Sequence, residues 1–189
     1  KLSDAGYFAV APNLFHRYTE QMMAARTGRI QYLSDLEIVA DVNSTVDFML
    51  DHPAVDREHI GVIGFCMGGR VTWLAAATNP HFKAAVLYYG GDIMVTWGTG
   101  EHTPLGMTSR ISCPVLFHFG ELDKNPSGED KQKLDAELTR LEIPHRFYTY
   151  PDADHAFMDR NGPRHNKRAF ELSWFRTLDF FYAHLLRQD

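Results

Sequence analysis

The stretch that decides the fold is IGVIGFCMGGR at residues 60–70. It opens with a continuous apolar run over 60–65, which predicts a strand covered on both faces. Residues 64–68 then have the form G-x-C-x-G, and a helical pattern over 68–78 follows directly. This order is typical of a tight strand-to-helix turn that exposes a nucleophile, with Cys66 in the position that serine usually holds.

The turn favours a reactive thiol at Cys66. The residues two before and two after the nucleophile must be small, and Gly64 and Gly68 meet this need. The N-terminus of the following helix points at the thiol, which lowers its pKa and stabilises negative charge. The backbone N–H of Met67 is therefore expected to be one oxyanion donor. The alternative is a structural role, because most buried cysteines are small core residues.

Predicted strands and helices alternate along the chain. Ser34 and Glu37 form a predicted capping box, and Ser127 is the expected N-cap of a later helix. The alternation predicts an α/β fold with a mostly parallel sheet flanked by helices, in a single domain over 1–189. The predicted strands are 7–11, 60–65, 84–89, 115–119 and 145–150, and the predicted helices are 35–51, 68–78, 127–141 and 165–187.

An acidic residue and a histidine follow two of the later strands. Asp123 comes after the strand at 115–119, and His155 comes after the strand at 145–150. Ligands bind at the carboxyl ends of the strands in such sheets, so Cys66, Asp123 and His155 are expected to converge there. Nucleophile, acid and histidine occur in the chain order of the α/β-hydrolase fold. Each residue alone has an ordinary structural explanation, but their order and placement together favour a catalytic triad.

With these residues in view, the chain resembles the dienelactone hydrolase family, which includes carboxymethylenebutenolidase-like proteins. The resemblance runs essentially end to end, and the cysteine in the turn is its most specific part. It implies an α/β-hydrolase fold and a Cys-His-Asp triad that hydrolyses a small ester or lactone through a thioester, without a metal or organic cofactor. The matching segments are GYFAVAPNLFHR (6–17), IGVIGFCMGGR (60–70), AVLYYGG (85–91), CPVLFHFGELD (113–123) and YPDADHAFMDR (150–160).

The same resemblance suggests residues that bind substrate. In the family, an arginine after the A-P-x-L strand end binds a substrate carboxylate, and Arg17 is the matching residue. A second family arginine aligns with Asp159 here, and Arg160 is one position further on. This departure extends the expected substrates to other esters and lactones. Trp97, in the irregular segment 92–113, is a further candidate because that segment can overhang the site.

The family comparison also predicts an incomplete domain. The opening residues KLSDAG read as the last turn of a helix, and a strand pattern follows at once. In the family, the opening strands and the loop with the second oxyanion donor come before this point. We therefore expect the α/β-hydrolase domain in these 189 residues to be N-terminally incomplete.

The composition limits the classes of partner that the protein is expected to bind. The net charge of −5 and the absence of a Lys/Arg cluster argue against nucleic acid, and no apolar run is long enough for a membrane helix. Two cysteines favour a reducing compartment, hence a cytoplasmic location, and we expect a monomer or weak homodimer. Cys113, at a strand start, is interpreted as structural, His118 as a core residue, and the scattered histidines predict no metal site.

Two other functions are compatible with these residues. A non-catalytic binding or interaction protein of the same fold would keep the triad and turn over no ester. A hydrolase of a different acyl bond, such as a thioester or peptide, would be separated by a substrate panel.

Overall fold

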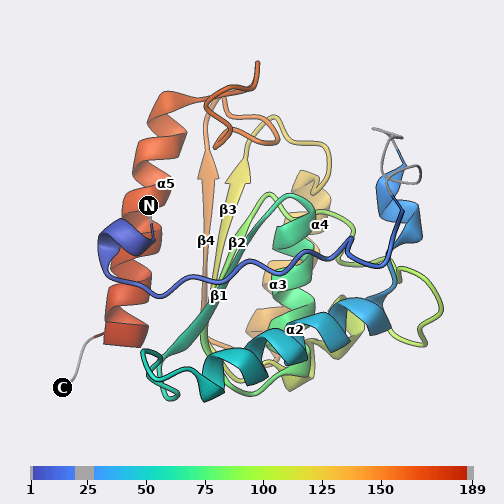
Figure 1. Cartoon of the computed structure of the whole chain (residues 1–189). Coiled ribbons are helices and arrows are strands. Elements are labelled where there is room, and N and C mark those ends of the chain that lie inside the picture. The colour runs from blue at the N-terminus through green and yellow to red at the C-terminus, as the bar shows by residue number, and fades with distance from the viewer. Residues whose placement is uncertain (1, 20–27, 187–189) are drawn as a thin grey trace.

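The computed structural model describes residues 2–19 and 28–186, which form an α/β fold. Four parallel strands pair in the order β1-β2-β3-β4, and helices cover both faces of the sheet (Figure 1). The strands are β1 (Ile60–Phe65), β2 (Phe82–Tyr88), β3 (Val115–Gly120) and β4 (His145–Tyr150). The helices are α2 (Asp35–Asp51), α3 (Met67–Thr78), α4 (Gly128–Arg140) and α5 (Lys167–Phe181), with 3-10 turns at Ser3–Ala5, Arg29–Tyr32 and Leu105–Arg110 and a π turn at Tyr182–Leu186.

The two faces of the sheet build two separate cores. Side chains alternate along β2, so Ala85 and Leu87 face the core formed with α2 and α3, while Val86 and Tyr88 face the core formed with α5. Figure 1 shows α5 on one side of the sheet and α2, α3 and α4 on the other. The predicted helices on both sides of a parallel sheet are therefore confirmed.

Helix α2 shows how the sequence positions one layer. Ile38, Val42 and Val46 recur at helical spacing and are buried against the sheet side of the molecule. Each such burial stabilises the fold by about 1.5–3 kcal/mol. The predicted capping box at its start is wrong, because the Ser34 side chain makes no capping hydrogen bond. Glu37 instead accepts a hydrogen bond from the Tyr18 hydroxyl at 3.0 Å.

The start of α4 is the opposite case. The Ser127 side chain accepts a hydrogen bond from the backbone N–H of Asp130, and the Asp130 carboxylate accepts one from the backbone N–H of Ser127. Both distances are ordinary, at 3.1 and 2.8 Å. This reciprocal pair satisfies two helix N–H groups, so the predicted start of this helix is confirmed.

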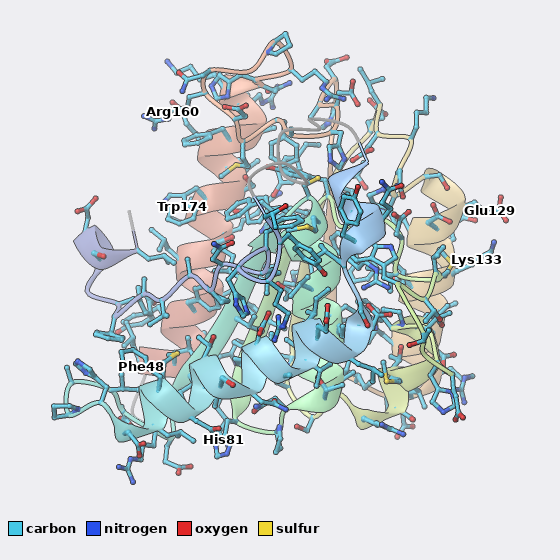
Figure 2. All side chains as sticks on the ribbon, turned by 45° about the vertical axis from the view of Figure 1, so that its right-hand side comes forward. Phe48, His81, Glu129, Lys133, Arg160 and Trp174 are labelled. Atoms are coloured by element: carbon cyan, nitrogen blue, oxygen red, sulfur yellow. The ribbon has the colours of Figure 1, made fainter. Side chains whose placement is uncertain are left out.

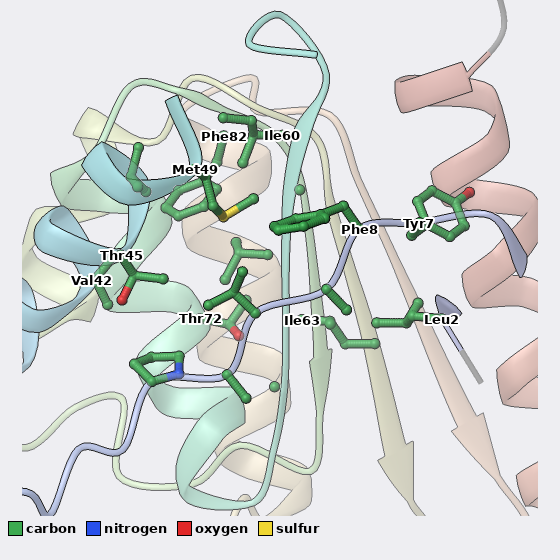
Figure 3. A pocket seen from close by; sticks show the side chains of 18 of the residues that line it. Leu2, Tyr7, Phe8, Val42, Thr45, Met49, Ile60, Ile63, Thr72 and Phe82 are labelled. Atoms are coloured by element: carbon green, nitrogen blue, oxygen red, sulfur yellow. The ribbon is translucent and has the colours of Figure 1, made fainter. Parts of the chain in front are cut away.

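The predicted strand at 7–11 is wrong. The segment is extended but pairs with no strand in the described part of the chain, and residues 9–11 are exposed. It passes β1 with a cavity of about 680 Å³ between them, which Figure 3 shows with Phe8 and Ile63 pointing toward it. Among the described strands β1 is consequently an edge, and residues 61–63 are only half-buried, whereas the sequence predicted cover on both faces.

Candidate active site

The turn after β1 holds Cys66 in a strained conformation. Its φ is 55° and its ψ is −119°, a region that residues other than glycine rarely adopt. Its backbone N–H donates to the Tyr88 carbonyl at 3.0 Å, and α3 begins at the next residue. Strain of this kind persists only where the surrounding structure fixes it, and it is concentrated at functional sites.

Two glycines allow this turn, and one of them differs from the predicted pair. A Cβ at Gly64 would lie 1.9 Å from the carbonyl oxygen of Gly68, so no other residue fits at position 64. A Cβ at Gly68 would meet no atom within 4 Å, so the expectation that Gly68 itself must be small is wrong. The second essential glycine is Gly69, whose Cβ would lie 2.8 Å from both Gly90 Cα and the Tyr88 carbonyl oxygen. Sequence spacing could not show which of Gly68 and Gly69 is required, because the close contacts of Gly69 are with Tyr88 at the end of β2 and with Gly90 just after it.

These contacts predict opposite results at neighbouring positions. Gly64→Ala is expected to lower the free energy of unfolding by about 3 kcal/mol, because backbone must move to admit the methyl group. Gly68→Ala is the matched control and is expected to change the free energy of unfolding by no more than about 1 kcal/mol. Urea denaturation of both variants measures the difference, and equal losses would contradict this account of the turn.

The predicted triad residues lie within hydrogen-bond distance of one another. His155 Nε2 lies 3.0 Å from Cys66 Sγ, and His155 Nδ1 lies 2.9 Å from Asp123 Oδ2. The three residues follow β1, β3 and β4, so all lie at the carboxyl ends of the strands, the upper edge of the sheet in Figure 1. The Asp123 side chain is only 2 % exposed, while the histidine is 20 % exposed. The acid is thus enclosed behind an imidazole that remains accessible.

Backbone contacts join the loop after β3, which carries Asp123, to the loop after β4, which carries His155. The N–H of Leu122 donates to the Ala153 carbonyl at 2.9 Å, and the N–H of Asn125 donates to Asp123 Oδ1 at 2.9 Å. The loops approach so closely at Gly120 that a Cβ there would lie 2.5 Å from the Ala153 oxygen. Both oxygens of Asp123 therefore have partners, and its orientation toward His155 is fixed.

The pKa shifts favour a thiolate–imidazolium pair. The hydrogen bond from His155 lowers the pKa of Cys66, and the Met67 backbone N–H lowers it further, against the opposing effect of burial. Hydrogen bonds to Asp123 and to Cys66 raise the pKa of His155 to about 10. Met67 is the first residue of α3, so its N–H is one of the helix N–H groups that lack an intrahelical acceptor.

A cavity of about 350 Å³ opens beside Cys66. It is much smaller than the cavity along β1, but none of the triad residues lines the larger one. The expected candidates Met67 and Trp97 both line the smaller cavity. The described residues that line it are Ile30, Cys66, Met67, Gly91, Asp92, Trp97, Asp123, Lys124, Asn125, Asp154, His155 and Arg164.

Neither arginine suggested by the family pattern lines this cavity. Arg17 forms a two-pronged ion pair with Asp41, with both N–O distances 2.6 Å, and its hydrogen bond lowers the pKa of that carboxyl group. Arg160 lies on the outer surface near the start of α5, with its guanidinium 4.5 Å from the centre of the Phe170 ring (Figure 2). In the described part of the chain an arginine that does line the cavity is Arg164, which sequence reasoning missed. Its only signal was a position in the loop between His155 and α5.

Two other residues have the structural environments that the sequence predicted. His118 is fully buried, with Nδ1 2.7 Å from the Tyr150 hydroxyl and Nε2 3.0 Å from Thr177 Oγ1. Burial lowers its pKa to about 3, so it is neutral at physiological pH. Cys113 is buried, and burial raises the pKa of its thiol to about 11. The chain therefore presents one accessible cysteine and one enclosed cysteine.

The described residues hold neither a metal-binding cluster nor a membrane-spanning helix. No group of three or more His, Cys, Asp or Glu side chains among them is arranged to hold a metal ion. Within the same residues, every helix is too short or too polar to span a lipid bilayer.

The parallel sheet and the turn after β1 define the class: this is an α/β-hydrolase fold. The model of the Dienelactone hydrolase family matches residues 1–185, so the chain belongs to this family of hydrolases. The chain is 30 % identical to a carboxymethylenebutenolidase of Rhodococcus opacus, over 97 % of this chain and 73 % of the relative. It is also 30 % identical to an Escherichia coli O157:H7 protein provisionally given that name, over 96 % of this chain and 68 % of the relative.

Solved structures agree on the fold. A Klebsiella pneumoniae protein described provisionally as a dienelactone hydrolase matches with a TM-score of 0.71 and 28 % identity, over 79 % of this chain. The match covers 62 % of the Klebsiella chain, so this chain corresponds to less than two thirds of that structure. A dienelactone hydrolase-like promiscuous phosphotriesterase from metagenomic libraries matches with a TM-score of 0.76 and 21 % identity, over 97 % of this chain and 77 % of the other. At that identity the second match supports the fold alone.

Proposed function

We propose that the protein hydrolyses small carboxylic esters or lactones, with Cys66 as nucleophile, His155 as general base and acid, and Asp123 as the residue that orients the imidazole. One observation carries the proposal: the imidazole of His155 lies 3.0 Å from the Cys66 sulfur and 2.9 Å from the Asp123 carboxylate. Nucleophile, base and orienting carboxylate in this arrangement form the unit that activates a thiol for acyl transfer.

In the first half of the reaction, the Cys66 thiolate attacks the carbonyl carbon and forms a C–S bond. The carbonyl oxygen becomes an oxyanion, and the Met67 N–H at the start of α3 is the proposed donor to it. As the intermediate collapses, the C–O bond of the ester breaks and its oxygen takes the proton from the His155 imidazolium. The products are a thioester on Cys66 and an alcohol, which stays attached to the acyl group when the substrate is a lactone.

In the second half, water replaces the leaving group. Neutral His155 removes a proton from the water as its oxygen bonds to the thioester carbon. The C–S bond then breaks, releasing the carboxylic acid and restoring the thiolate and imidazolium. The Asp123 carboxylate accepts the hydrogen bond from Nδ1 and favours the imidazole tautomer with a proton there.

The relatives support an ester or lactone as the substrate class. The Rhodococcus opacus relative is named a carboxymethylenebutenolidase, which denotes action on a lactone. The proposal includes esters and lactones that carry no carboxylate, because Asp41 already neutralises Arg17 and neither Arg17 nor Arg160 lines the cavity. Among the described residues that line the cavity, Lys124 and Arg164 are the lysine and arginine side chains, so they are candidates for contacting an anionic group.

Selective alkylation tests the nucleophile without requiring a substrate. Iodoacetamide is expected to label Cys66 at least 100-fold faster than Cys113 near neutral pH, because thiolate is the reactive form. The pKa of Cys66 is lowered by His155, so its labelling should persist as the pH falls until it passes through that lowered pKa. Cys113, with its pKa raised to about 11 and its side chain buried, should stay unreactive. Peptide mapping gives both rates, and equal labelling would contradict the assignment.

A substrate panel tests the bond that is cleaved. We expect measurable turnover of 4-nitrophenyl acetate and of a five-membered enol lactone, and much slower turnover of a peptide anilide with its poorer leaving group. Hydrolysis of the anilide alone would assign a different acyl bond. An intact triad with no turnover of any of these compounds would instead support a binding role.

A further inference from the structure

Arg70 lies on α3, four residues after Cys66. Its side chain is fully buried, and it is the largest charged side chain enclosed in the described part of the molecule. Burying a charge is costly unless it is paired and hydrogen-bonded. The partners of Arg70 therefore show what the fold gains from placing it there.

On one side, Arg70 binds the start of α2. Its Nη1 lies 2.5 Å from Asp35 Oδ1, and its Nη2 lies 3.1 Å from Asp35 Oδ2. Asp35 is itself buried, with only 4 % of its surface exposed. The planar guanidinium matches both carboxylate oxygens at once, which a lysine ammonium does not do.

On the other side, Arg70 binds a segment without helix or strand. Its Nε donates to the Asp92 carbonyl at 3.0 Å, and its Nη2 donates to the Val95 carbonyl at 2.5 Å. Its guanidinium carbon lies 3.9 Å from the centre of the Trp97 ring. The same segment is tied to Asp35, because the Trp97 N–H donates to Asp35 Oδ2 and the Asp35 N–H donates to the Trp97 carbonyl, both at 2.9 Å.

The segment that Arg70 holds is also a wall of the candidate active site. Gly91, Asp92 and Trp97 line the cavity beside Cys66, whereas Arg70 does not reach it. Trp97 is the largest side chain in that lining and is 8 % exposed. Its indole therefore forms part of the wall of the cavity that Cys66 also lines.

We infer that Arg70 is a positioning residue that fixes Trp97 against the cavity and thereby sets the size of the substrate group that the site accepts. The inference rests on the proposed function for its meaning in catalysis. The size of the molecules that reach the Cys66 sulfur can be measured without any turnover of substrate.

Alkylation of Cys66 by maleimides of increasing size tests this inference. The rates for N-methylmaleimide and N-benzylmaleimide give a size ratio for each protein. Arg70→Lys keeps the positive charge but loses the planar guanidinium that binds two oxygens at once. In this variant we expect the rate with N-benzylmaleimide, relative to the rate with N-methylmaleimide, to rise about tenfold. Iodoacetamide labelling, which needs little space, should change less than twofold. The matched control is Arg140→Lys, because Arg140 pairs with Glu137 on the surface of α4 and is expected to leave the ratio unchanged.

Trp97→Ala provides a second test that does not depend on how well Arg70→Lys folds. It removes the indole directly and is also expected to raise the size ratio about tenfold or more. An unchanged ratio in Trp97→Ala would overturn the inference. An unchanged ratio in folded Arg70→Lys, with only a lower unfolding midpoint, would overturn it as well, because Arg70 would then stabilise the fold without controlling the cavity.

Ester turnover extends the test to catalysis. With 4-nitrophenyl acetate and hexanoate, Arg70→Lys should lower KM for the longer ester relative to the shorter one, with similar changes in kcat for both. If the unmodified protein turns over neither ester, the proposed function fails while the maleimide ratios still decide the role of Arg70.

Discussion

Replacing Cys66 with alanine is expected to lower kcat for 4-nitrophenyl acetate by about 10⁴-fold or more. The proposed thioester forms on the Cys66 sulfur, and without it His155 has no thiol to activate. Because Cys66 lies at the accessible turn between β1 and α3, alanine should leave the free energy of unfolding within about 1 kcal/mol of the original value. Initial rates and urea denaturation together measure both effects.

The matched control for this variant is Cys113→Ala. It makes the same chemical change at a buried position and is expected to keep turnover while losing some stability. Full activity in Cys66→Ala would contradict covalent catalysis at this residue. Equal losses of activity in the two variants would point to misfolding as the cause.

Asp123→Asn is expected to lower kcat by about 10⁴-fold while leaving the loops in place. The carboxylate accepts the proton on His155 Nδ1, and an amide at this position can donate to Nδ1 instead. Donation would place the imidazole proton on Nε2, where it faces Cys66 and blocks the nitrogen as a base. The hydrogen bond that raises the pKa of His155 would also be lost, so less imidazolium would remain at neutral pH to stabilise the thiolate.

Asp123→Asn has a matched control, and it is expected to change the pH dependence of Cys66 labelling. Asp152→Asn makes the same charge change in the His155 loop, outside the cavity lining, and is expected to retain activity. In Asp123→Asn, iodoacetamide labelling of Cys66 should decline at a higher pH than in the original protein. Activity and a labelling profile that both match those of Asp152→Asn would show that the carboxylate does not orient the histidine.

The sequence predicted best those elements whose pattern is purely local. The strand β1 is a continuous apolar run, and β3 and β4 are rich in aromatic side chains; their predicted ranges agree with the structure within a residue. The segment at 7–11 has the same apolar character, yet it forms no strand among the described residues because pairing depends on a neighbour. Local composition shows that a segment is apolar but does not identify its partner.

The residues of the candidate site also differ in how far the local sequence could predict them. Cys66, Asp123 and His155 could be placed at one edge because each lies in the loop or turn that follows a strand, and parallel strands share their carboxyl ends. Arg70 and Asp35 are 35 residues apart, and nothing in their spacing indicates a buried ion pair. The same holds for Arg164, which reaches the cavity through the path of an irregular loop. Contacts of this kind depend on tertiary packing, which a single sequence does not display.

The most direct test of the central claim is to trap the acyl-enzyme. The protein is mixed with 4-nitrophenyl acetate, quenched in acid within the first turnovers, and analysed by intact mass and peptide mapping. The account predicts a mass increase of one acetyl group, located on the peptide that contains Cys66 and removed by hydroxylamine. Asp123→Asn should form it more slowly, and Cys66→Ala should not form it. Steady turnover with no acetyl group on Cys66, or with the group on another residue, would contradict the account.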